Sequence, residues 1–330
     1  MNVGAPAAQV AALLVSAVAT AALWRWRARL PLAAPNARTL HASPVPRVGG
    51  IAIWAGWLPV ALVSPAVPAM SIALWGVPWL ALAVVSLRDD IRAVPVMPRI
   101  AVHSVAACGF AIALATMGRA DIPIVLVAVV ALVVAWSLNL YNFMDGTDGL
   151  AATMTVVGFA AYGAVLLHDA RPAALPLALA AATLPVLVVN LPPARMFVGD
   201  VGAIPLGFLA AALGIGGVVD GAWGAWFPVL VFLPFIADAT VTLARRALAG
   251  ERVWEAHKSH HYQRLHQLGA GHAGTLAVFG ALMAGTAGTA VACACLKPEW
   301  GVPALAAWCT ACALLFAAID YHWRRTTTTT

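Results

Sequence analysis

Long apolar stretches, interrupted by charged residues only at their ends, make up most of the chain. Residues 122–144, for example, lie between Asp121 and Asp145 without a single charge. A helix needs about 20 apolar residues to cross a bilayer, whereas the strands of a membrane barrel would alternate polar and apolar positions. The pattern therefore predicts an all-α fold, a polytopic bundle of transmembrane helices.

Eleven such spans can be placed along the sequence. They cover roughly residues 6–24, 49–66, 70–87, 100–117, 122–140, 150–167, 173–190, 204–221, 225–243, 273–295 and 301–320. Because spans of about 20 residues leave only loops between them, we expect residues 1–325 to form a single membrane domain. The threonine-rich end, 326–330, is predicted to be a disordered tail.

The composition agrees with this class of protein. Of the 330 residues, 62% are hydrophobic and 10% are charged, whereas soluble domains carry about 25% charged residues. A soluble enzyme, a disordered chain and a secreted disulfide scaffold are thereby excluded. Residues 1–10 lack the basic segment of a signal peptide. The five cysteines lie within apolar stretches, where we expect them to pack between helices.

The positions of the basic residues predict how the helices are oriented. With the N-terminus outside, the inside loops hold 16 of the 19 lysines and arginines, and the outside loops hold only Arg119, Arg171 and Lys297. Cytoplasmic loops of membrane proteins carry such an excess of positive charge, so we expect an N-out, C-in topology. Contact with an anionic membrane surface then explains the net charge of +6 without nucleic acid as a partner.

Polar residues recur at every third position around the end of the fifth predicted span. They are Asn139, Asn142, Asp145 and Asp148. In the predicted topology they lie on the cytoplasmic side, and their amide and carboxylate oxygens are hard ligands of the kind that Mg²⁺ prefers. Helix capping is the alternative interpretation, although capping uses only one or two such residues.

Two further acidic segments fall on the same predicted face. Asp89 and Asp90 follow the third span, where they either serve a metal and a proton or form surface ion pairs. Asp200 lies between Gly199 and Gly202, in a loop that also carries Arg195. Glycine lets the backbone approach a phosphate closely and arginine donates to phosphates, whereas an ordinary inside loop is the alternative.

Three histidines lie within five residues in the predicted inside loop 244–272. They are His257, His260 and His261. A zinc site is disfavoured, because the segment has no cysteine and no second pair of ligands at the usual spacing. Together with Lys258 and Arg264 the histidines suit a ligand with several phosphates, or else an amphipathic surface segment.

The first inside loop contains further candidate phosphate donors. Its two prolines, Pro44 and Pro46, exclude a regular helix. The donors are Arg38, His41 and Arg47, and a plain connecting loop is the alternative.

Taken together, these segments resemble one protein family. HASPVPRVGG, the DD pair at 89–90, NLYNFMDGTDGLA, ARMFVGDVG and HKSHH occur in the order found in the polyprenyl-phosphate N-acetylhexosamine-1-phosphate transferases, glycosyltransferase family 4. The resemblance implies transfer of an amino-sugar 1-phosphate from a UDP-N-acetylhexosamine to undecaprenyl phosphate, with release of UMP and with Mg²⁺ as cofactor. It also implies a multi-pass protein of the bacterial inner membrane whose active site faces the cytoplasm.

The resemblance assigns roles to individual residues. It implies metal ligands at Asn142 and Asp200. Asp89 and Asp90 match an acidic pair assigned to activating the lipid phosphate, and Asp145 and Asp148 match a pair on the nucleotide side. The substrate-binding residues would be Arg47, Asn139, Arg195, His257, His260 and His261.

The sequence also departs from the family pattern. Ala203 stands where many members carry Ser, and Arg99 and His103 stand where many carry Lys and Gln. HKSHHYQRL resembles the branch that starts O-antigen-like surface polysaccharides rather than the peptidoglycan enzyme, which leaves GlcNAc, QuiNAc and FucNAc as candidate sugars. A membrane carrier for a phosphorylated or nucleotide-linked solute is the rival class, and a metal transporter built on the histidines is a third. The sequence leaves open whether the chain forms a homodimer.

Overall fold

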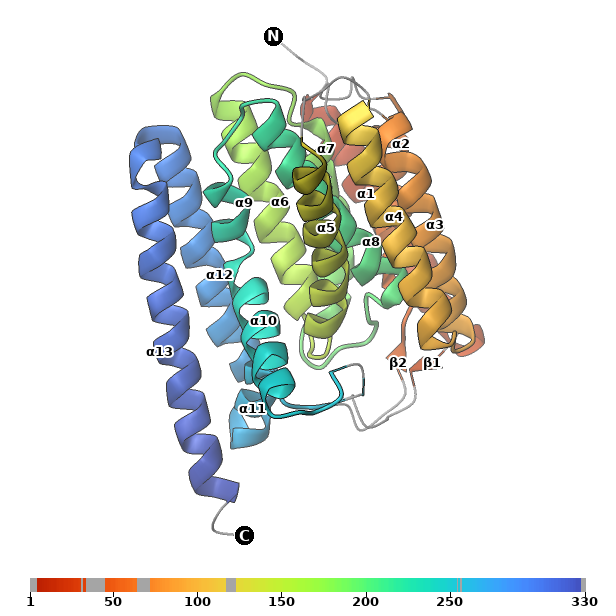
Figure 1. Ribbon diagram of the computed structural model, residues 1–330. Helices are drawn as coiled ribbons and strands as arrows, with labels where there is room; N and C mark the ends of the chain where they lie inside the picture. Colours follow the sequence, from red (N-terminus) through yellow and green to blue (C-terminus); the bar gives the residue numbers. More distant parts are fainter. Residues whose placement is uncertain are drawn as a thin grey trace.

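The computed structural model describes residues 5–30, 32–33, 45–63, 72–116, 123–253, 255 and 257–327. In this part of the chain the long helices run side by side along one direction (Figure 1). They are α1 (Ala5–Arg25), α2 (Gly49–Val63), α3 (Ile72–Ile91), α4 (Val96–Thr116), α5 (Ile124–Met144), α6 (Leu150–His168), α7 (Ala174–Asn190), α8 (Asp200–Val219), α10 (Leu233–Leu248), α12 (Gly271–Leu296) and α13 (Gly301–Thr327).

Short elements connect the long helices. They are α9 (Trp226–Val231), α11 (His261–Leu265), the 3₁₀ turns η1 (Arg27–Arg29) and η4 (Pro298–Trp300), the π-helical turn η3 (His266–Ala270), and two strands, β1 (Leu32–Ala33) and β2 (Val45–Pro46). The strands pair antiparallel, with Leu32 opposite Pro46 and Ala33 opposite Val45. This pairing fixes the chain just before Arg47 and the start of α2.

The structure confirms the all-α polytopic membrane fold. Seven helical segments in the described residues are long and apolar enough to cross a bilayer, and α2 and α7 are shorter apolar helices. Each predicted span coincides with one long helix except the ninth, which is broken at Phe232 between α9 and α10. Pro234 has no N–H and its ring cannot continue the α9 helix, which accounts for the break. Orientation in the membrane and the number of crossings stay predictions.

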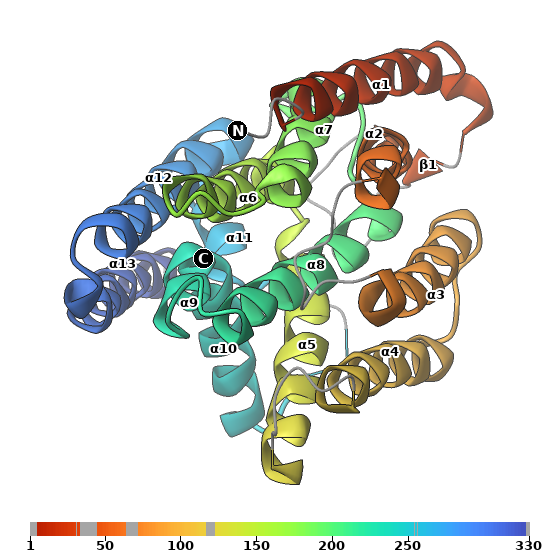
Figure 2. The same ribbon diagram turned by 90° about the horizontal axis from the view of Figure 1, so that it is seen from above.

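α8 forms the centre of the bundle, as the view along the helices shows (Figure 2). Of its apolar stretch 89% is buried inside the protein, compared with 17% for α1 and for the segment that contains α13. Small residues make this position possible. A Cβ on Gly207 would lie 2.4 Å from the carbonyl oxygen of Ser137 on α5, so glycine lets the two backbones approach closely.

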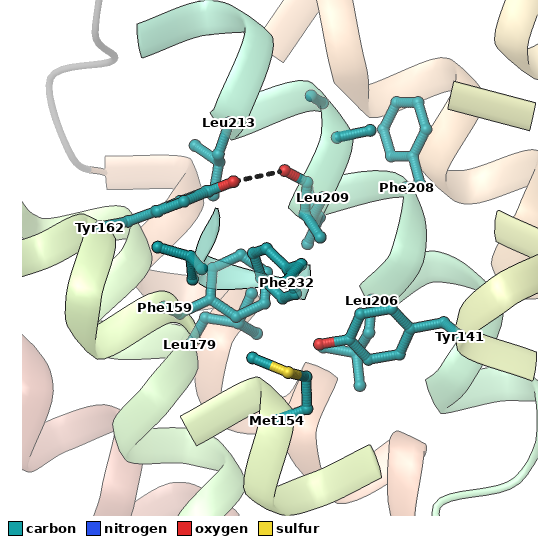
Figure 3. Close-up of a cluster of buried hydrophobic side chains, with 14 of the residues drawn as sticks. Tyr141, Met154, Phe159, Tyr162, Leu179, Leu206, Phe208, Leu209, Leu213 and Phe232 are labelled. Atoms are coloured by element: carbon teal, nitrogen blue, oxygen red, sulfur yellow. Dashed lines mark hydrogen bonds between the residues drawn. The ribbon is translucent and has the colours of Figure 1, made fainter. Parts of the chain in front are cut away.

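Aromatic and aliphatic side chains fill the space between α5, α6, α7 and α8 (Figure 3). Tyr141, Phe159 and Phe232 are buried there. The ring centroids of Tyr141 and of Phe159 each lie 6.1 Å from that of Phe232. The hydroxyl of Tyr162 donates to the carbonyl of Ala210 at 3.1 Å, so this buried polar atom is satisfied. The middle of the bundle is therefore a packed core.

Several helix ends differ from the sequence prediction, and three of them matter for the site. α3 continues to Ile91, four residues beyond its predicted end at 87, so Asp89 and Asp90 lie on the helix and do not follow it. α5 continues to Met144, so Asn142 lies on the helix, and α8 begins at Asp200, four residues before the predicted start at 204. α13 continues through Thr327, two residues into the predicted tail. The end of α3, the end of α5, the end of α7 and the start of α8 all lie at the lower end of the bundle in Figure 1.

Candidate active site

Four carboxylates and two guanidinium groups meet at this lower end, and we call them the acidic cluster. Its members are Asp89 and Asp90 at the end of α3, Asp145 after α5, Asp200 at the start of α8, Arg47 and Arg99. Their segments are far apart in the sequence. The prediction that these segments share one face of the bundle therefore agrees with the structure for this group.

Asp90 holds the first turn of α8. Its carboxylate accepts hydrogen bonds from the backbone N–H groups of Asp200 at 3.1 Å and Val201 at 2.8 Å. Nε of Arg47 lies 3.1 Å from the same carboxylate, which is fully buried. A carboxylate at a helix N-terminus satisfies unpaired N–H groups and interacts favourably with the helix dipole. Asp90 is thus a cap for α8 supplied by another helix.

Asp89 is held by the other arginine. Nη1 of Arg99 donates to its carboxylate at 2.5 Å, and the backbone N–H of Val94 donates at 2.6 Å. Arg99 reaches further, since its Nη1 lies 3.9 Å from Asp200. Each arginine therefore spans two carboxylates, which fixes the distances within the cluster.

Glycine backbones allow the segments of the cluster to approach one another. The N–H groups of Gly49 and Gly50 donate to the carbonyls of Phe197 and Val198 at 2.9 and 2.8 Å. Gly199 has a φ of 75°, and a Cβ there would lie 2.3 Å from the carbonyl oxygen of Arg47. The PRVGG and VGD segments are therefore packed backbone to backbone.

Asp145 closes the cluster on the side of α5. It follows the last residue of α5, and the backbone N–H of Gly199 donates to its carboxylate. Burial and the neighbouring Asp200 carboxylate raise the pKa of Asp145 well above its ordinary value, although the Arg47 charge opposes the shift. A second positive charge beside Asp145 and Asp200 would stabilise their ionised forms.

The donor set fits a magnesium ion. In their ionised forms, the four carboxylates would carry two more negative charges than the two arginines neutralise. In the described part of the chain, no three or more His, Cys, Asp or Glu side chains are grouped as a complete metal site. Mg²⁺ does not require such a group, because it usually binds one or two carboxylates and completes its shell with water and substrate phosphates. Asp200 and Asp145 interact electrostatically within the cluster, and Asn142 lies three residues before Asp145.

Asp148 lies beside the cluster but has other partners. One carboxylate oxygen accepts the backbone N–H of Ala194 at 2.8 Å, and the other lies 3.5 Å from Nδ1 of His272. That ring nitrogen also contacts the Thr147 hydroxyl at 2.6 Å. Asp148 therefore connects the turn after α5, the loop before α8 and the start of α12.

The remaining predicted residues have different environments. The amide of Asn139 donates back to Ala135 of its own helix at 2.7 Å, one turn away from Asn142. Asn142 is partly buried, and Arg195 is exposed on the loop before α8. Arg38 and His41 lie outside the described residues.

The three histidines occupy the loop before α11 and its first residue. His257 is partly exposed, and its Nδ1 contacts the Ser259 hydroxyl at 2.9 Å. The rings of His257 and His260 stack with centroids 4.8 Å apart, and the His260 ring lies 6.0 Å from that of Phe143 on α5. His261 is fully buried against Asp238 of α10, 3.2 Å from its carboxylate. Of the three, His257 alone keeps an accessible side chain.

Several residues that support the site were not among the predicted site residues. They are Arg99, Asn190, Asp238, His272 and Asp320. Asn190 accepts the N–H of Gly149 at 3.1 Å and donates to the carbonyl of Met196 at 2.9 Å, so it joins the two loops of the site. All five are polar residues at or near the ends of apolar stretches, which was the available signal.

A cavity of about 190 Å³ lies at the opposite end of the bundle. Tyr162, Leu213, Gly217 and Trp223 are among its mostly apolar lining residues. It is separated from the acidic cluster by the length of α8, so it takes no part in the chemistry of the cluster.

Comparison with known proteins finds a similarity to one family. The profile of glycosyl transferase family 4 matches residues 72–218, which contain Asp89, Asp90, Asp145, Asp148 and Asp200. Over these residues, which are less than half of its length, the chain is similar to glycosyl transferase family 4.

Two of the similar proteins align with almost three quarters of the chain, and a third aligns with a shorter part. A "Decaprenyl-phosphate N-acetylglucosaminephosphotransferase" of Mycobacterium tuberculosis is 28% identical in an alignment that covers 73% of this chain and 70% of that protein. A "Probable undecaprenyl-phosphate N-acetylglucosaminyl 1-phosphate transferase" of Bacillus subtilis is 26% identical over 72% of this chain and 70% of its own. A "Phospho-N-acetylmuramoyl-pentapeptide-transferase" of Enterococcus hirae is 30% identical over 38% of this chain and 39% of its own.

Proposed function

We propose that the protein transfers an N-acetylhexosamine 1-phosphate from a UDP-sugar to undecaprenyl phosphate and releases UMP. The observation that carries this proposal is the acidic cluster at one end of a membrane-spanning bundle, in a chain that is similar to glycosyl transferase family 4. The named relatives act on polyprenyl phosphates. A site at the bundle end lets a water-soluble nucleotide sugar and the phosphate of a membrane lipid meet.

The chemistry suits the charges of the cluster. Phosphoryl transfer depends mainly on alignment and on neutralising the oxygens of the phosphates. Mg²⁺ bound by Asp200, and by Asn142 or Asp145, would neutralise the diphosphate of the donor. Arg47 and Arg99 sit at the same point and add positive charge. Since one phosphoanhydride forms as another breaks, we expect the reaction to be reversible.

The contacts suggest a division of roles among the carboxylates. Asp89 and Asp90 are held by short contacts to arginines and backbone N–H groups. We therefore assign them the task of fixing Arg47, Arg99 and the start of α8. Asp200 has longer contacts to the arginines, 3.6 and 3.9 Å. Asp145 and Asp200 are the carboxylates best placed to meet metal or substrate.

Other residues are placed to bind the two substrates. Exposed Arg195 and partly exposed His257 lie on the loops that border the cluster and can donate to phosphate oxygens. In the topology predicted from the basic residues, these loops face the cytoplasm of a bacterial cell. The HKSHHYQRL segment favours an early membrane step of an O-antigen-like surface polysaccharide pathway.

The packing of the bundle disfavours the carrier alternative. Carriers usually bind their solute near the middle of the membrane. Here Tyr141, Phe159, Phe232 and their neighbours fill the middle of the bundle, whereas the polar groups gather at one end (Figure 3).

The test is a transfer assay with donors labelled in the β-phosphate. Purified protein, undecaprenyl phosphate and Mg²⁺ are incubated with UDP-GlcNAc, UDP-QuiNAc or UDP-FucNAc, and the label is followed into an organic-extractable product. UMP should appear in equal amount, and added UMP should return the label to the nucleotide sugar. Asp200→Asn should remove the activity. The control is Asp169→Asn, an exposed carboxylate after α6 at the opposite end of the bundle.

Two results would contradict the proposal. Release of UDP in place of UMP would mean transfer of the sugar without its phosphate. Movement of intact label across sealed vesicles, with no lipid product from any of the three donors, would support a carrier.

A further inference from the structure

A second group of charged residues joins the C-terminal helix to the histidine segment, and we call it the α13 clamp. It comprises Asp238 and Arg245 of α10, His261 and Arg264 of α11, and Asp320 of α13. Asp320 is its centre. Its carboxylate pairs with Arg245, accepts from Nη1 of Arg264 at 2.6 Å, and lies 3.6 Å from Nε2 of His261.

His261 links the two carboxylates of the clamp. Its Nδ1 lies 3.2 Å from Asp238 and its Nε2 lies 3.6 Å from Asp320. The ring stacks on Phe316 of α13, with centroids 4.1 Å apart and planes 9° from parallel. The side chain has no exposed surface. Its Nδ1 and one ring face contact the protein, whereas Nε2 faces Asp320 at 3.6 Å and has no hydrogen-bond partner among the described residues.

Asp238 sets the start of α11. Its carboxylate accepts the backbone N–H groups of His261 and Tyr262, each at 2.9 Å, and the Thr242 hydroxyl at 3.0 Å. Unpaired N–H groups at a buried helix start require such acceptors. The position of α11 therefore depends on Asp238 from one side and on Asp320 from the other.

Tyr262 transmits this position to the acidic cluster. The residue is fully buried, and its hydroxyl donates to the carbonyl of Phe143 at 2.9 Å. A Cβ on Gly146 would lie 2.0 Å from that hydroxyl oxygen, so the turn that carries Asp145 packs directly on Tyr262. A shift of α11 would displace both His257 and Asp145.

We propose that Asp320 is a positioning residue that holds α11 through its hydrogen bond with Arg264 and its contact with His261, so that the histidine segment and the Asp145 turn face the same bound donor. His261 then serves in the clamp and does not contact the substrate. The inference rests on the proposed transferase function, but the position of α11 can be measured without it. All residues of the clamp lie beyond the residues that match the family profile, 72–218. The similarity to the family over those residues therefore says nothing about the clamp.

The first experiment compares Asp320→Asn, Asp320→Glu and the wild-type protein. Asn keeps the shape but loses the charge, whereas Glu keeps the charge. Asp320→Asn loses the charge-assisted hydrogen bond with Arg264 that helps to hold α11. This loss should raise the donor KM by about tenfold. The KM for undecaprenyl phosphate and kcat should change by less than about threefold, and Asp320→Glu should recover most of the donor affinity. The matched control is Glu299→Gln, an exposed carboxylate near the other end of the same helix.

The second experiment measures amide hydrogen exchange at His261 and Tyr262, whose N–H groups donate to Asp238. Faster exchange in Asp320→Asn, together with the donor KM change, supports the proposal. Unchanged exchange overturns it. Faster exchange with an unchanged donor KM also overturns it, because Asp320 would then stabilise the fold without positioning the site.

A double variant separates the clamp from a direct ligand role of His261. His261→Phe keeps the stacking on Phe316 but loses both links to carboxylates. If His261 acts only in the clamp, His261→Phe combined with Asp320→Asn should raise the donor KM no more than the larger single change. Additive increases would mean that His261 contacts the donor and would refute the proposal. If wild-type protein transfers nothing to the lipid, the proposed function fails, and amide exchange alone decides whether the clamp holds α11.

Discussion

Gly199 is the residue whose replacement tests the geometry of the acidic cluster most directly. It precedes α8 with φ 75° and ψ 167°, a conformation open essentially to glycine alone. A Cβ there would lie 2.3 Å from the carbonyl oxygen of Arg47 and 2.9 Å from Oδ2 of Asp90. Gly199→Ala therefore forces a choice between backbone strain and separation of the segments.

Backbone strain and separation of the segments destabilise the cluster by similar amounts of free energy. A non-glycine residue held in such a conformation costs about 1–3 kcal/mol. Moving the start of α8 away relieves the strain, but it weakens the bonds from Asp200 and Val201 to Asp90. Hydrogen bonds to a charged group contribute about 1.5–3 kcal/mol each. A shift of about 1 Å in a reacting group can reduce the rate about 100-fold, so we expect kcat to fall by about this factor.

The assay is the transfer reaction with labelled donor, measured at saturating donor and acceptor. Gly250→Ala is the matched control, because Gly250 has φ 73° but no atom within 4 Å of an added Cβ. It shares the positive φ without the contact to Arg47. If Gly199→Ala keeps kcat within about threefold of wild type, or if both variants lose activity equally, the close approach of Arg47 does not position Asp200.

Three further predictions concern the same cluster and the topology. Asp200→Asn should abolish transfer or sharply raise the Mg²⁺ requirement, because a hard cation loses its anionic ligand. If the variant instead shows the same dependence of activity on Mg²⁺ concentration as the wild-type protein, Asp200 is not a metal ligand. The raised pKa of Asp145 means that a proton competes with the cation at low pH. Apparent Mg²⁺ affinity should therefore increase from about pH 5 to about pH 8, with proton release on binding, and a flat profile by calorimetry would contradict this. In a variant whose five native cysteines are replaced, expressed in intact cells, Ser259→Cys should resist an impermeant thiol reagent and Glu299→Cys should react with it. The reverse pattern would overturn the N-out, C-in topology.

The sequence predicts the membrane fold well, because apolar length is a local property. One helix per span follows from it, and so does the gathering of acidic residues at one end of the bundle. The break at Phe232 was also signalled locally, by Pro234, although the length of the apolar stretch concealed it. α5 and α8 both extend beyond their predicted ends, because polar residues can occupy the first and last turns of a membrane helix.

The partners of each polar side chain could not be predicted in the same way. Asp90 and Asp89 are neighbours in sequence, yet one caps α8 and the other pairs with Arg99. This division depends on where α4 and α8 pack, and local sequence does not contain that information. Asp320 shows the same limit, since its charge at the end of a predicted span marked it as unusual but did not name Arg264 or His261 as its partners.

The DD pair and the GD motif act as one structural unit, and this explains why a glycine stands before Asp200. α8 is the most buried long helix of the bundle, so water cannot readily satisfy the N–H groups of its first turn. A Ser, Thr, Asp or Asn at the position before the helix would normally do so. That position is Gly199, and the space that such a side chain would fill contains the carboxylate of Asp90 and the backbone of Arg47. Because α3 supplies the cap, the carboxylate of Asp200 is not needed to complete the helix and is left to interact with Arg47 and Arg99 in the cluster.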